Sequence, residues 1–305
     1  MPELPEVETV ANGVDARVRG QRIVSVWTSG MPQTFKSAEA EIEEVLTAAR
    51  IERVRRVGKT IVMTLWRREA DSSAPTPPIK SDRWEPRSAL RNDNQEDGAD
   101  GGGAEFLVHL GMTGRLLVSA AGVPLPTHTH AVLRLGDGRE VRFVDPRRFG
   151  RLSVRRLEPA TEGYAGPGVE PLTISVDKFR RLFKGRKTAI KAALLNQSLL
   201  HGVGNIYADE ALARAGVRPR RRAGRLTRVE YRALHEALKE VLLRAIELGG
   251  SSVSDYVDAD GVRGFFQLEH RVYGRGGEAC RVCGTAIRKI VVGGRGTHYC
   301  PTCQR

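Results

Sequence analysis

The sequence predicts an α+β fold with a β-rich first half, a helical second half and a small cysteine-containing end. Three observations predict it. Short apolar runs of β type, separated by glycine-containing turns, occupy the chain between residues 23 and 144. From Asp177 onward, apolar residues recur at helical spacing instead. All four cysteines of the 305-residue chain lie beyond residue 279, so they belong to one short segment.

The β-rich half begins with a helix. Apolar residues recur at helical spacing from Val7 to Val18, which predicts an amphipathic helix between Pro5 and about Arg19. A second helix is expected at Ala38–Ala49. The strands predicted from the short apolar runs are Ile23–Trp27, Ile51–Val57, Thr60–Trp66, Glu105–Leu110, Arg115–Val118, Ala131–Leu135 and Glu140–Val144. Many short strands with glycine turns favour a β-sandwich or a barrel with helices at its edges.

The helical half follows a linker rich in glycine and proline. The helices predicted there are Asp177–Phe183, Thr188–Asn196, Asn205–Ala215 and Thr227–Leu248. We therefore divide the chain into four parts. They are a β-sandwich domain at residues 1–162, a linker at 163–171, a helical domain at 172–271 and the cysteine-containing section at 272–305.

Composition and charge narrow the class of protein. Hydrophobic residues make up 40% and charged residues 28% of the chain, which is ordinary globular usage and excludes wholesale disorder. No apolar run approaches the roughly 18–20 residues of a membrane span, and the N-terminus lacks the apolar core of a signal peptide. We expect a cytoplasmic monomer with no membrane partner. The net charge of +13 favours a polyanionic partner, nucleic acid first.

Residues 70–104 differ from the rest of the chain in composition. They include seven acidic and four basic residues, so the segment carries −3 and the remaining chain +16. Its large apolar residues are Ile79, Trp84 and Leu90, too few to offset the entropy cost of ordering it. We expect a disordered insertion between two strands. A small ordered lid around Trp84 is the alternative.

The most specific motif consists of two Cys-x2-Cys pairs, Cys280, Cys283, Cys300 and Cys303. Such pairs supply four thiolates for one tetrahedral Zn²⁺, and a site closed by four protein ligands is structural. Two redox disulfides are the alternative. Between the pairs, Ile287–Val292 and Thr297–Tyr299 flank two glycines, which predicts a β-hairpin. Its basic residues, such as Arg295, suit phosphate binding.

The N-terminus offers a nucleophile. A small residue such as Pro2 permits removal of Met1, which leaves a secondary amine. An α-amino group has a pKa of about 8, so it is partly neutral at physiological pH and able to attack a sugar carbon. Glu3 and Glu6 lie beside it and can move protons. The alternative is that Pro2 and the glutamates merely begin a helix.

Two glycine-flanked turns and two helix starts are candidate DNA contacts. His109–Gly114 carries Met112, and Asp145–Gly150 carries Arg147 and Phe149; apolar wedges and an arginine suit the gap left by an extruded base. The alternative is that Met112 and Phe149 lie in the core. Gly202–Asn205 opens a helix whose N–H groups suit a phosphate, and residues 187–191 open the preceding helix.

Together these segments resemble the bacterial formamidopyrimidine-DNA glycosylase family over nearly the whole chain. The residues that carry the resemblance are Pro2–Thr9, Gly58-Lys59, His109–Gly114, Asp145–Gly150, Lys187–Lys191, Gly202–Ala208, Val272–Arg275 and the four cysteines. The resemblance implies an N-terminal β-sandwich with flanking helices, and a C-terminal helix–two-turns–helix domain with a zinc hairpin. It further implies that double-stranded DNA with oxidised bases or abasic sites binds between them.

The resemblance also implies roles for single residues. Pro2 would attack C1′ of the damaged nucleotide, Glu3 would protonate the opening sugar, and Glu6 and Lys59 would complete the catalytic group. β,δ-Elimination would then excise the sugar. Phosphate-binding positions are matched by Lys59, His109, Asn205 and Arg295, and Lys191 is also placed among the DNA-binding residues. Met112, Arg147 and Phe149 match residues that fill the void, with Arg147 facing the base opposite the lesion.

Two other functions remain open at this point. A glycosylase of the endonuclease VIII type shares Pro2, Glu3 and the zinc finger but removes oxidised pyrimidines. A non-catalytic zinc-finger protein that binds damaged DNA is the alternative from another class. The segment Ser251–Glu269 aligns with a mobile loop that closes over the flipped base, and it is the part whose contacts are least defined by sequence.

Overall fold

The computed structural model describes residues 1–68, 101–158, 162–253 and 256–305. Most of the predicted insertion 70–104 lies outside these residues. Its last four, Gly101–Ala104, belong instead to a strand that pairs with residues 65–68. Backbone pairing needs no large side chains, so a run of glycines joins the ladder although its composition predicted disorder. Among the described residues, no helix is long and apolar enough to cross a membrane.

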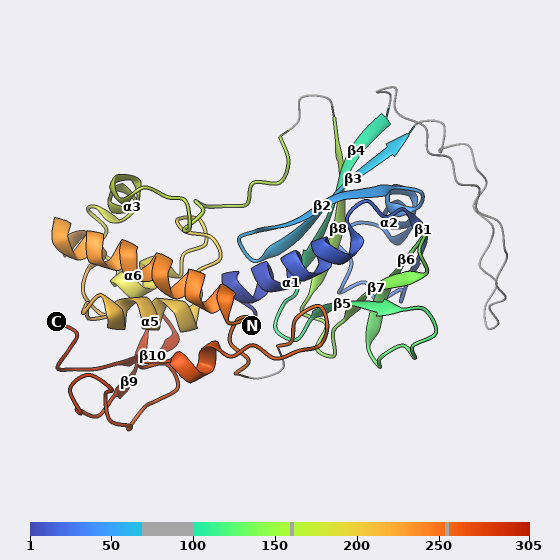
Figure 1. Ribbon diagram of the computed structural model, residues 1–305. Helices are drawn as coiled ribbons and strands as arrows, with labels where there is room; N and C mark the ends of the chain where they lie inside the picture. The colour runs from blue at the N-terminus through green and yellow to red at the C-terminus, as the bar shows by residue number, and fades with distance from the viewer. Residues whose placement is uncertain (69–100, 159–161, 254–255) are drawn as a thin grey trace.

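The described residues of the β-rich half form two four-stranded antiparallel sheets (Figure 1). One has the order β2 (Arg50–Val57), β3 (Thr60–Arg68), β4 (Gly101–His109) and β8 (Arg151–Leu157). The other has the order β1 (Ile23–Thr28), β6 (Thr129–Leu135), β7 (Arg139–Val144) and β5 (Arg115–Ala120). Side chains of both sheets, such as Phe106 and Leu133, share one buried core, which confirms the predicted β-sandwich.

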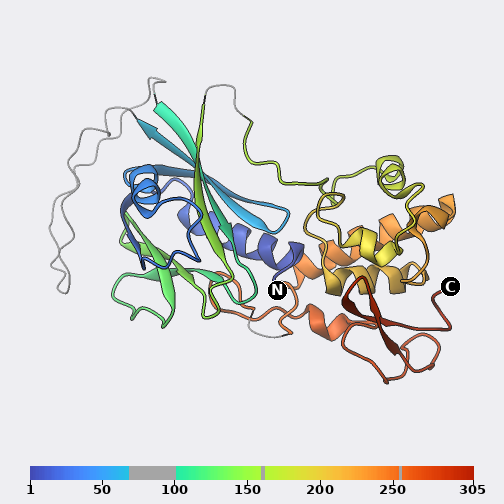
Figure 2. The ribbon, with the colours of Figure 1, turned by 180° about the vertical axis from the view of Figure 1, so that it is seen from behind.

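Helix α1 (Leu4–Val18) joins the two halves of the molecule. Its valines from Val7 to Val18 belong to the sandwich core, whereas Leu4 belongs to the core of the helical half. Helix α2 (Glu39–Leu46) packs on the sandwich, as expected for a helix at its edge. In both views of the ribbon, the N-terminus therefore lies between the two lobes (Figures 1 and 2).

The helical half contains α3 (Val176–Phe183), α4 (Ile190–Leu194), α5 (Asn205–Arg214) and α6 (Arg228–Glu247), with short 3-10 turns at Ala223–Arg225 and Phe266–Glu269. Helix α4 is shorter than the predicted Thr188–Asn196. The carbonyl of Thr188 accepts the Ala223 N–H and Ala189 bridges to Arg222, so a long-range contact replaces the first predicted turn. Its end at Leu194 is also earlier than predicted.

A segment after α6 returns to the sandwich. Tyr256 and Ala259 are buried in the sandwich core, and the Arg17 side chain pairs with Asp260. The helical part predicted at 172–271 is therefore not confined to the helical half. Beyond it, β9 (Arg288–Val292) and β10 (Arg295–Tyr299) form the antiparallel hairpin predicted between the cysteine pairs.

Candidate active site and nucleic-acid interface

The N-terminus enters the boundary between the two halves. Met1 is exposed, whereas Pro2 is buried at the start of α1. The Leu4 N–H donates to the Gly202 carbonyl at 3.0 Å, which ties the first residues to the loop before α5. Pro2 thus lies where sandwich and helices meet, and removal of Met1 would place its amine there.

Glu3 is a buried carboxyl at the N-terminus of α5. The Ile206 and Tyr207 N–H groups donate to its two oxygens at 3.2 and 3.5 Å, and the side chain is almost fully buried. Burial raises the pKa of Glu3 to about 7, with a further increase from Glu6 and an opposing effect of the Lys59 charge. Glu3 is therefore a carboxyl that holds its proton near neutral pH, as a general acid must.

Gly204 leaves the space that Glu3 occupies. A Cβ on Gly204 would lie 2.1 Å from the Glu3 carboxyl carbon, far inside van der Waals contact. The sequence suggested that the N–H groups at this helix start bind a DNA phosphate. The structure shows that the Ile206 and Tyr207 N–H groups instead bind the carboxyl of Glu3. Nothing in the local sequence indicated this role, because the partner is 203 positions away.

We expect Gly204→Ala to lower the single-turnover rate of base excision, the activity that the sequence resemblance implies, by about 100-fold. The methyl group would displace the Glu3 carboxyl by more than a bond length. Gly102→Ala is the control, since nothing lies within 4 Å of a Cβ at Gly102. The rates are measured on a duplex with one oxidised guanine. A Gly204→Ala protein that excises at the rate of the control would contradict this account.

Glu6 connects three parts of the chain. It accepts hydrogen bonds from the Glu3 N–H at 2.8 Å, from the Ser251 N–H at 2.7 Å and from the Tyr207 hydroxyl. Burial raises the pKa of Glu6, and these three donors oppose the rise. Glu6 thus holds α1, α5 and the segment after α6 in one arrangement around Glu3.

Lys59 and His109 border this group. Lys59 lies in the turn between β2 and β3. Burial lowers its pKa, while the charges of Glu3 and Glu6 oppose the decrease. His109 ends β4, and its Nδ1 accepts the Gly111 N–H at 3.1 Å. Burial and the charges of Lys59 and Arg151 lower the pKa of His109. Lys59 and His109 thus place two nitrogen-bearing side chains next to the carboxyls, as the binding of a DNA phosphate requires.

The two predicted loops present Met112, Arg147 and Phe149 to solvent. Met112 is 42% exposed and Phe149 is 46% exposed, so the alternative that they are core residues is wrong. The Arg147 guanidinium carbon lies 4.9 Å from the centre of the Phe149 ring, within cation–π range. Large apolar side chains held in solvent beside an arginine are typical of a binding surface.

Asp145 fixes both loops, a role that sequence reasoning did not assign to it although it begins the motif Asp145–Gly150. It is fully buried, and it accepts the Thr113 hydroxyl at 2.5 Å, the Gly150 N–H at 2.7 Å and the Arg147 N–H at 3.3 Å. A Cβ on Gly111, whose φ is +63°, would lie 2.5 Å from the Gly150 nitrogen. The loops therefore pack too closely for any side chain at Gly111, and the aspartate sets their spacing.

The four cysteines fit one zinc ion. Their sulfurs lie within 4.8 Å of one another, with Sγ–Sγ distances of 3.9 Å for Cys280 and Cys303 and 3.5 Å for Cys283 and Cys300. Zn–S bonds of about 2.3 Å in a tetrahedron require sulfurs about 3.8 Å apart. All four are free cysteines, so the alternative of two disulfides is wrong for this structure. The donor set supports one structural zinc.

We expect Cys300→Ser to lose the bound zinc and to lower affinity for abasic-site DNA at least about tenfold, because metal binding supplies much of the folding free energy of such a small hairpin. Zinc content is measured by atomic absorption and affinity by fluorescence anisotropy. Val282→Ala, an exposed change between Cys280 and Cys283 of the same cysteine cluster, is the control. Full affinity in a zinc-free Cys300→Ser protein would overturn the structural role.

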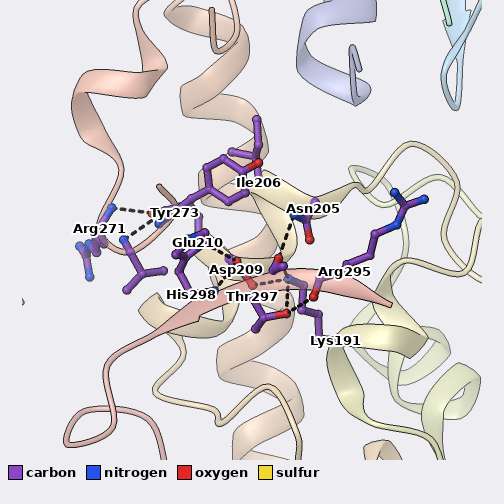
Figure 3. A network of polar contacts seen from close by, with 12 residues as sticks. Lys191, Asn205, Ile206, Asp209, Glu210, Arg271, Tyr273, Arg295, Thr297 and His298 are labelled. Carbon is purple, nitrogen blue, oxygen red and sulfur yellow. Dashed lines mark hydrogen bonds and ion pairs between the residues drawn. The ribbon is translucent and has the colours of Figure 1, made fainter. Parts of the chain in front are cut away.

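The hairpin docks on α4 and α5 (Figure 3). Arg295 begins β10 and is exposed, and the Asn205 amide donates to the Gly296 carbonyl at 3.0 Å. Glu210 of α5 accepts the N–H groups of Arg271, Val272 and Tyr273 at 2.8, 2.9 and 2.9 Å, which anchors the start of the cysteine-containing section. Lys191, by contrast, is fully buried under the hairpin and offers no surface to DNA.

Comparison with known proteins covers the chain from end to end. Three family profiles match it: the formamidopyrimidine-DNA glycosylase N-terminal domain at residues 1–152, the H2TH domain of the same enzymes at 167–257, and the zinc finger found in FPG and IleRS at 277–305. A formamidopyrimidine-DNA glycosylase of Solibacter usitatus is 40% identical over 306 residues, with both chains fully covered. The chain belongs to the formamidopyrimidine-DNA glycosylase family. This confirms the resemblance predicted from the motifs, including the helix–two-turns–helix domain.

Other members of the formamidopyrimidine-DNA glycosylase family agree in sequence and in structure. The enzyme of Xanthomonas campestris is 39% identical over 307 residues, again with full coverage of both chains. A variant of Lactococcus lactis FPG in complex with a Fapy-dG containing DNA has 30% identity and a TM-score of 0.79, with full coverage. The wild-type Lactococcus lactis protein with an oxidized pyrimidine containing DNA has 29% identity and a TM-score of 0.78, also with full coverage.

Proposed function

We propose that this chain excises oxidised purines, such as 8-oxoguanine and formamidopyrimidines, from double-stranded DNA and then cleaves the abasic site. One observation carries the proposal. Pro2 is buried between the two halves, next to Glu3, whose pKa of about 7 lets it carry a proton near neutral pH. A pure DNA-binding protein has no need of a proton-holding carboxyl beside a buried N-terminal proline.

The chemistry follows from these groups. With Met1 removed, the Pro2 nitrogen attacks C1′ of the damaged nucleotide, and the bond from C1′ to the base breaks. The base leaves with the electron pair and takes up the proton that the Pro2 nitrogen loses. Glu3 protonates the sugar ring oxygen as the ring opens, and an iminium forms between Pro2 and C1′. The iminium acidifies the C2′ proton, so loss of that proton expels the 3′ phosphate, and a second elimination expels the 5′ phosphate. Water then releases the sugar fragment from Pro2.

The exposed loops serve base extrusion. A base that leaves the stack opens a void, and Met112 and Phe149 are large apolar side chains able to fill it. Arg147, stacked on Phe149, supplies donors for the acceptor edge of a cytosine left without its partner. Pairing with cytosine is the mark of a damaged guanine, so this arrangement favours oxidised purines over oxidised pyrimidines.

Borohydride trapping tests the function. Reduction of the iminium joins Pro2 covalently to DNA, so we expect an adduct through Pro2 on a duplex with 8-oxoguanine opposite cytosine. Stronger trapping on thymine glycol would transfer the protein to the oxidised-pyrimidine class, for which the related complex with an oxidized pyrimidine gives reason to look. No adduct on either duplex with the zinc-loaded protein would leave only a DNA-binding role.

The setting of this activity follows from its substrate. We propose that the protein acts in the cytoplasm, where a bacterial chromosome is accessible, and that it binds duplex DNA as a monomer. Its positive net charge of +13 supports attraction to the DNA backbone. In this proposal Lys59, His109, Asn205 and Arg295 bind phosphates around the lesion.

A further inference from the structure

Lys191 of α4 is a buried cation whose hydrogen bonds all point into the protein. Its ammonium group lies 2.8 Å from Asp209 Oδ1, 3.0 Å from the Gly296 carbonyl oxygen and 2.7 Å from the Thr297 hydroxyl (Figure 3). An ammonium group has three donors, so these contacts use all of them. Lys191 therefore has no donor left for a phosphate, and it is fully buried.

Asp209 of α5, the partner of Lys191, also binds strand β10, to which Gly296 and Thr297 belong. It is fully buried, and its Oδ2 accepts the His298 N–H at 2.8 Å. The Gly296 carbonyl accepts both Lys191 and the Asn205 amide. The ion pair between Lys191 and Asp209 thus fixes residues 296–298 of β10 against helices α4 and α5 of the helical half.

These contacts lie directly beside the residues that face DNA in the proposed function. Arg295 precedes Gly296, and Asn205 is bonded to that same carbonyl. The turn of the hairpin also touches α4, since a Cβ on Gly293 would lie 3.0 Å from Ala192 Cβ. The spacing between the exposed Arg295 side chain and the Asn205 amide is therefore determined by how firmly the hairpin is docked.

We propose that Lys191 and Asp209 are positioning residues, which lock the zinc hairpin onto α4 and α5 so that Arg295 and Asn205 meet the DNA backbone at a fixed spacing. This inference rests on the proposed function for the identity of the ligand. Removal of either partner leaves an unpaired charge in a buried place, so a single substitution releases the strand rather than merely weakening one contact.

The test measures affinity for an abasic-site duplex over a series of salt concentrations, for Lys191→Met, Arg295→Ala and the double variant. Each phosphate contact contributes about 0.9 to the slope of log K against log salt. We expect Lys191→Met to lower affinity about tenfold and the slope by about one, as Arg295→Ala does. The double variant should bind no more than about twofold more weakly than Lys191→Met, because release of the hairpin already removes the Arg295 contact.

Lys191→Arg separates positioning from direct contact. A phosphate contact made by Lys191 itself would survive in Lys191→Arg and would be additive with Arg295→Ala, and either result overturns the inference. Positioning predicts that Lys191→Arg fails to restore affinity, because a planar guanidinium does not fit three acceptors arranged around one ammonium. Zinc content equal to that of the unsubstituted protein is required of each variant. If Lys191→Met does not fold, Thr297→Val takes its place, because it removes one of the three contacts of the ammonium group. It must also lower the affinity for the abasic-site duplex.

Docking is also measured without DNA. Hydrogen exchange of the β10 amides, His298 above all, should become at least about tenfold faster in Lys191→Met and stay unchanged in Arg295→Ala. The exchange measurement needs no DNA, so it still tests the docking of the hairpin if the protein does not form a covalent adduct with damaged DNA. Failure of the proposed function is therefore distinguishable from failure of the positioning role. Unchanged exchange in Lys191→Met overturns the inference.

Discussion

One extra residue ahead of Pro2 will abolish both base excision and covalent trapping. An N-terminal glycine before Pro2, or retained Met1, converts the secondary amine into an amide, and an amide nitrogen has no free electron pair for attack on C1′. Pro2 is buried at the boundary of the two halves, so the amine of an added residue lies one residue away from the position of the Pro2 nitrogen. We expect the rate on 8-oxoguanine DNA to fall by at least about 1,000-fold, as for loss of other covalent nucleophiles.

The comparison uses protein whose intact mass proves loss of Met1. Pro2→Gly, processed in the same way, is the matched variant: it keeps an N-terminal amine and should still form a borohydride adduct, at a lower rate. Equal zinc content and equal unfolding temperature show that the fold is unchanged. An adduct in the extended protein at the normal rate would mean that the nucleophile is elsewhere.

Glu3→Gln will remove most excision activity and, with it, the dependence of the rate on pH near neutrality. Glu3 acts in its protonated form, and its pKa of about 7 places the loss of that form between pH 6 and 8. The single-turnover rate of the unsubstituted protein should therefore decline on the alkaline side of about pH 7. Glutamine holds no transferable proton, so we expect a rate at least about 100-fold lower and without this decline.

The same substitution should stabilise the protein at alkaline pH. The pKa of Glu3 is raised from 4.5 in the unfolded chain to about 7 in the folded protein, so the folded state binds more protons between these values. Stability from this group is complete below pH 4.5 and is lost as pH rises through about 7. Glu3→Gln should raise the free energy of unfolding by up to about 3 kcal/mol at pH 8 and by much less at pH 5.

Thermal unfolding at the two pH values measures this difference. Glutamine has one acceptor oxygen in place of two, so it keeps the hydrogen bond from only one of the Ile206 and Tyr207 N–H groups. The increase in the free energy of unfolding therefore stays below about 3 kcal/mol. An equal or lower unfolding temperature of Glu3→Gln at pH 8 would show that the carboxyl is not penalised by burial. Active sites commonly lower stability in this way.

Most of the fold followed from local patterns. Seven of the eight sandwich strands were predicted, because apolar residues that face one core alternate along the strand. Strand β8 was missed: Leu152 and Val154 do alternate and are buried, but three arginines in the strand concealed the pattern. The shorter α4 shows the opposite case, since residues 188 and 189 have helical spacing in sequence yet bond to a distant segment.

The sequence predicted the zinc ligands of the candidate site but not the residues that position its catalytic and DNA-facing groups. The four cysteines stand at a spacing that only a metal or disulfides explain, and their sulfurs meet as predicted. Gly204, Asp145 and Asp209 carried no comparable signal, because each acts on a partner in another segment. Lys191, in a segment predicted to open a helix, has the side chain of a phosphate ligand but the position of a core residue.

The sequence by itself determined the chemical parts: a proline that becomes an amine, carboxyls beside it, four thiolates, and a chain basic enough to attract DNA. These depend on residue type and on short spacings, which the sequence states directly. Only the tertiary structure decided that Glu3 keeps its proton near pH 7 and that Lys191 faces Asp209 instead of solvent. Burial and charge–charge distance arise from contacts between segments far apart in the chain, and those contacts set protonation and accessibility.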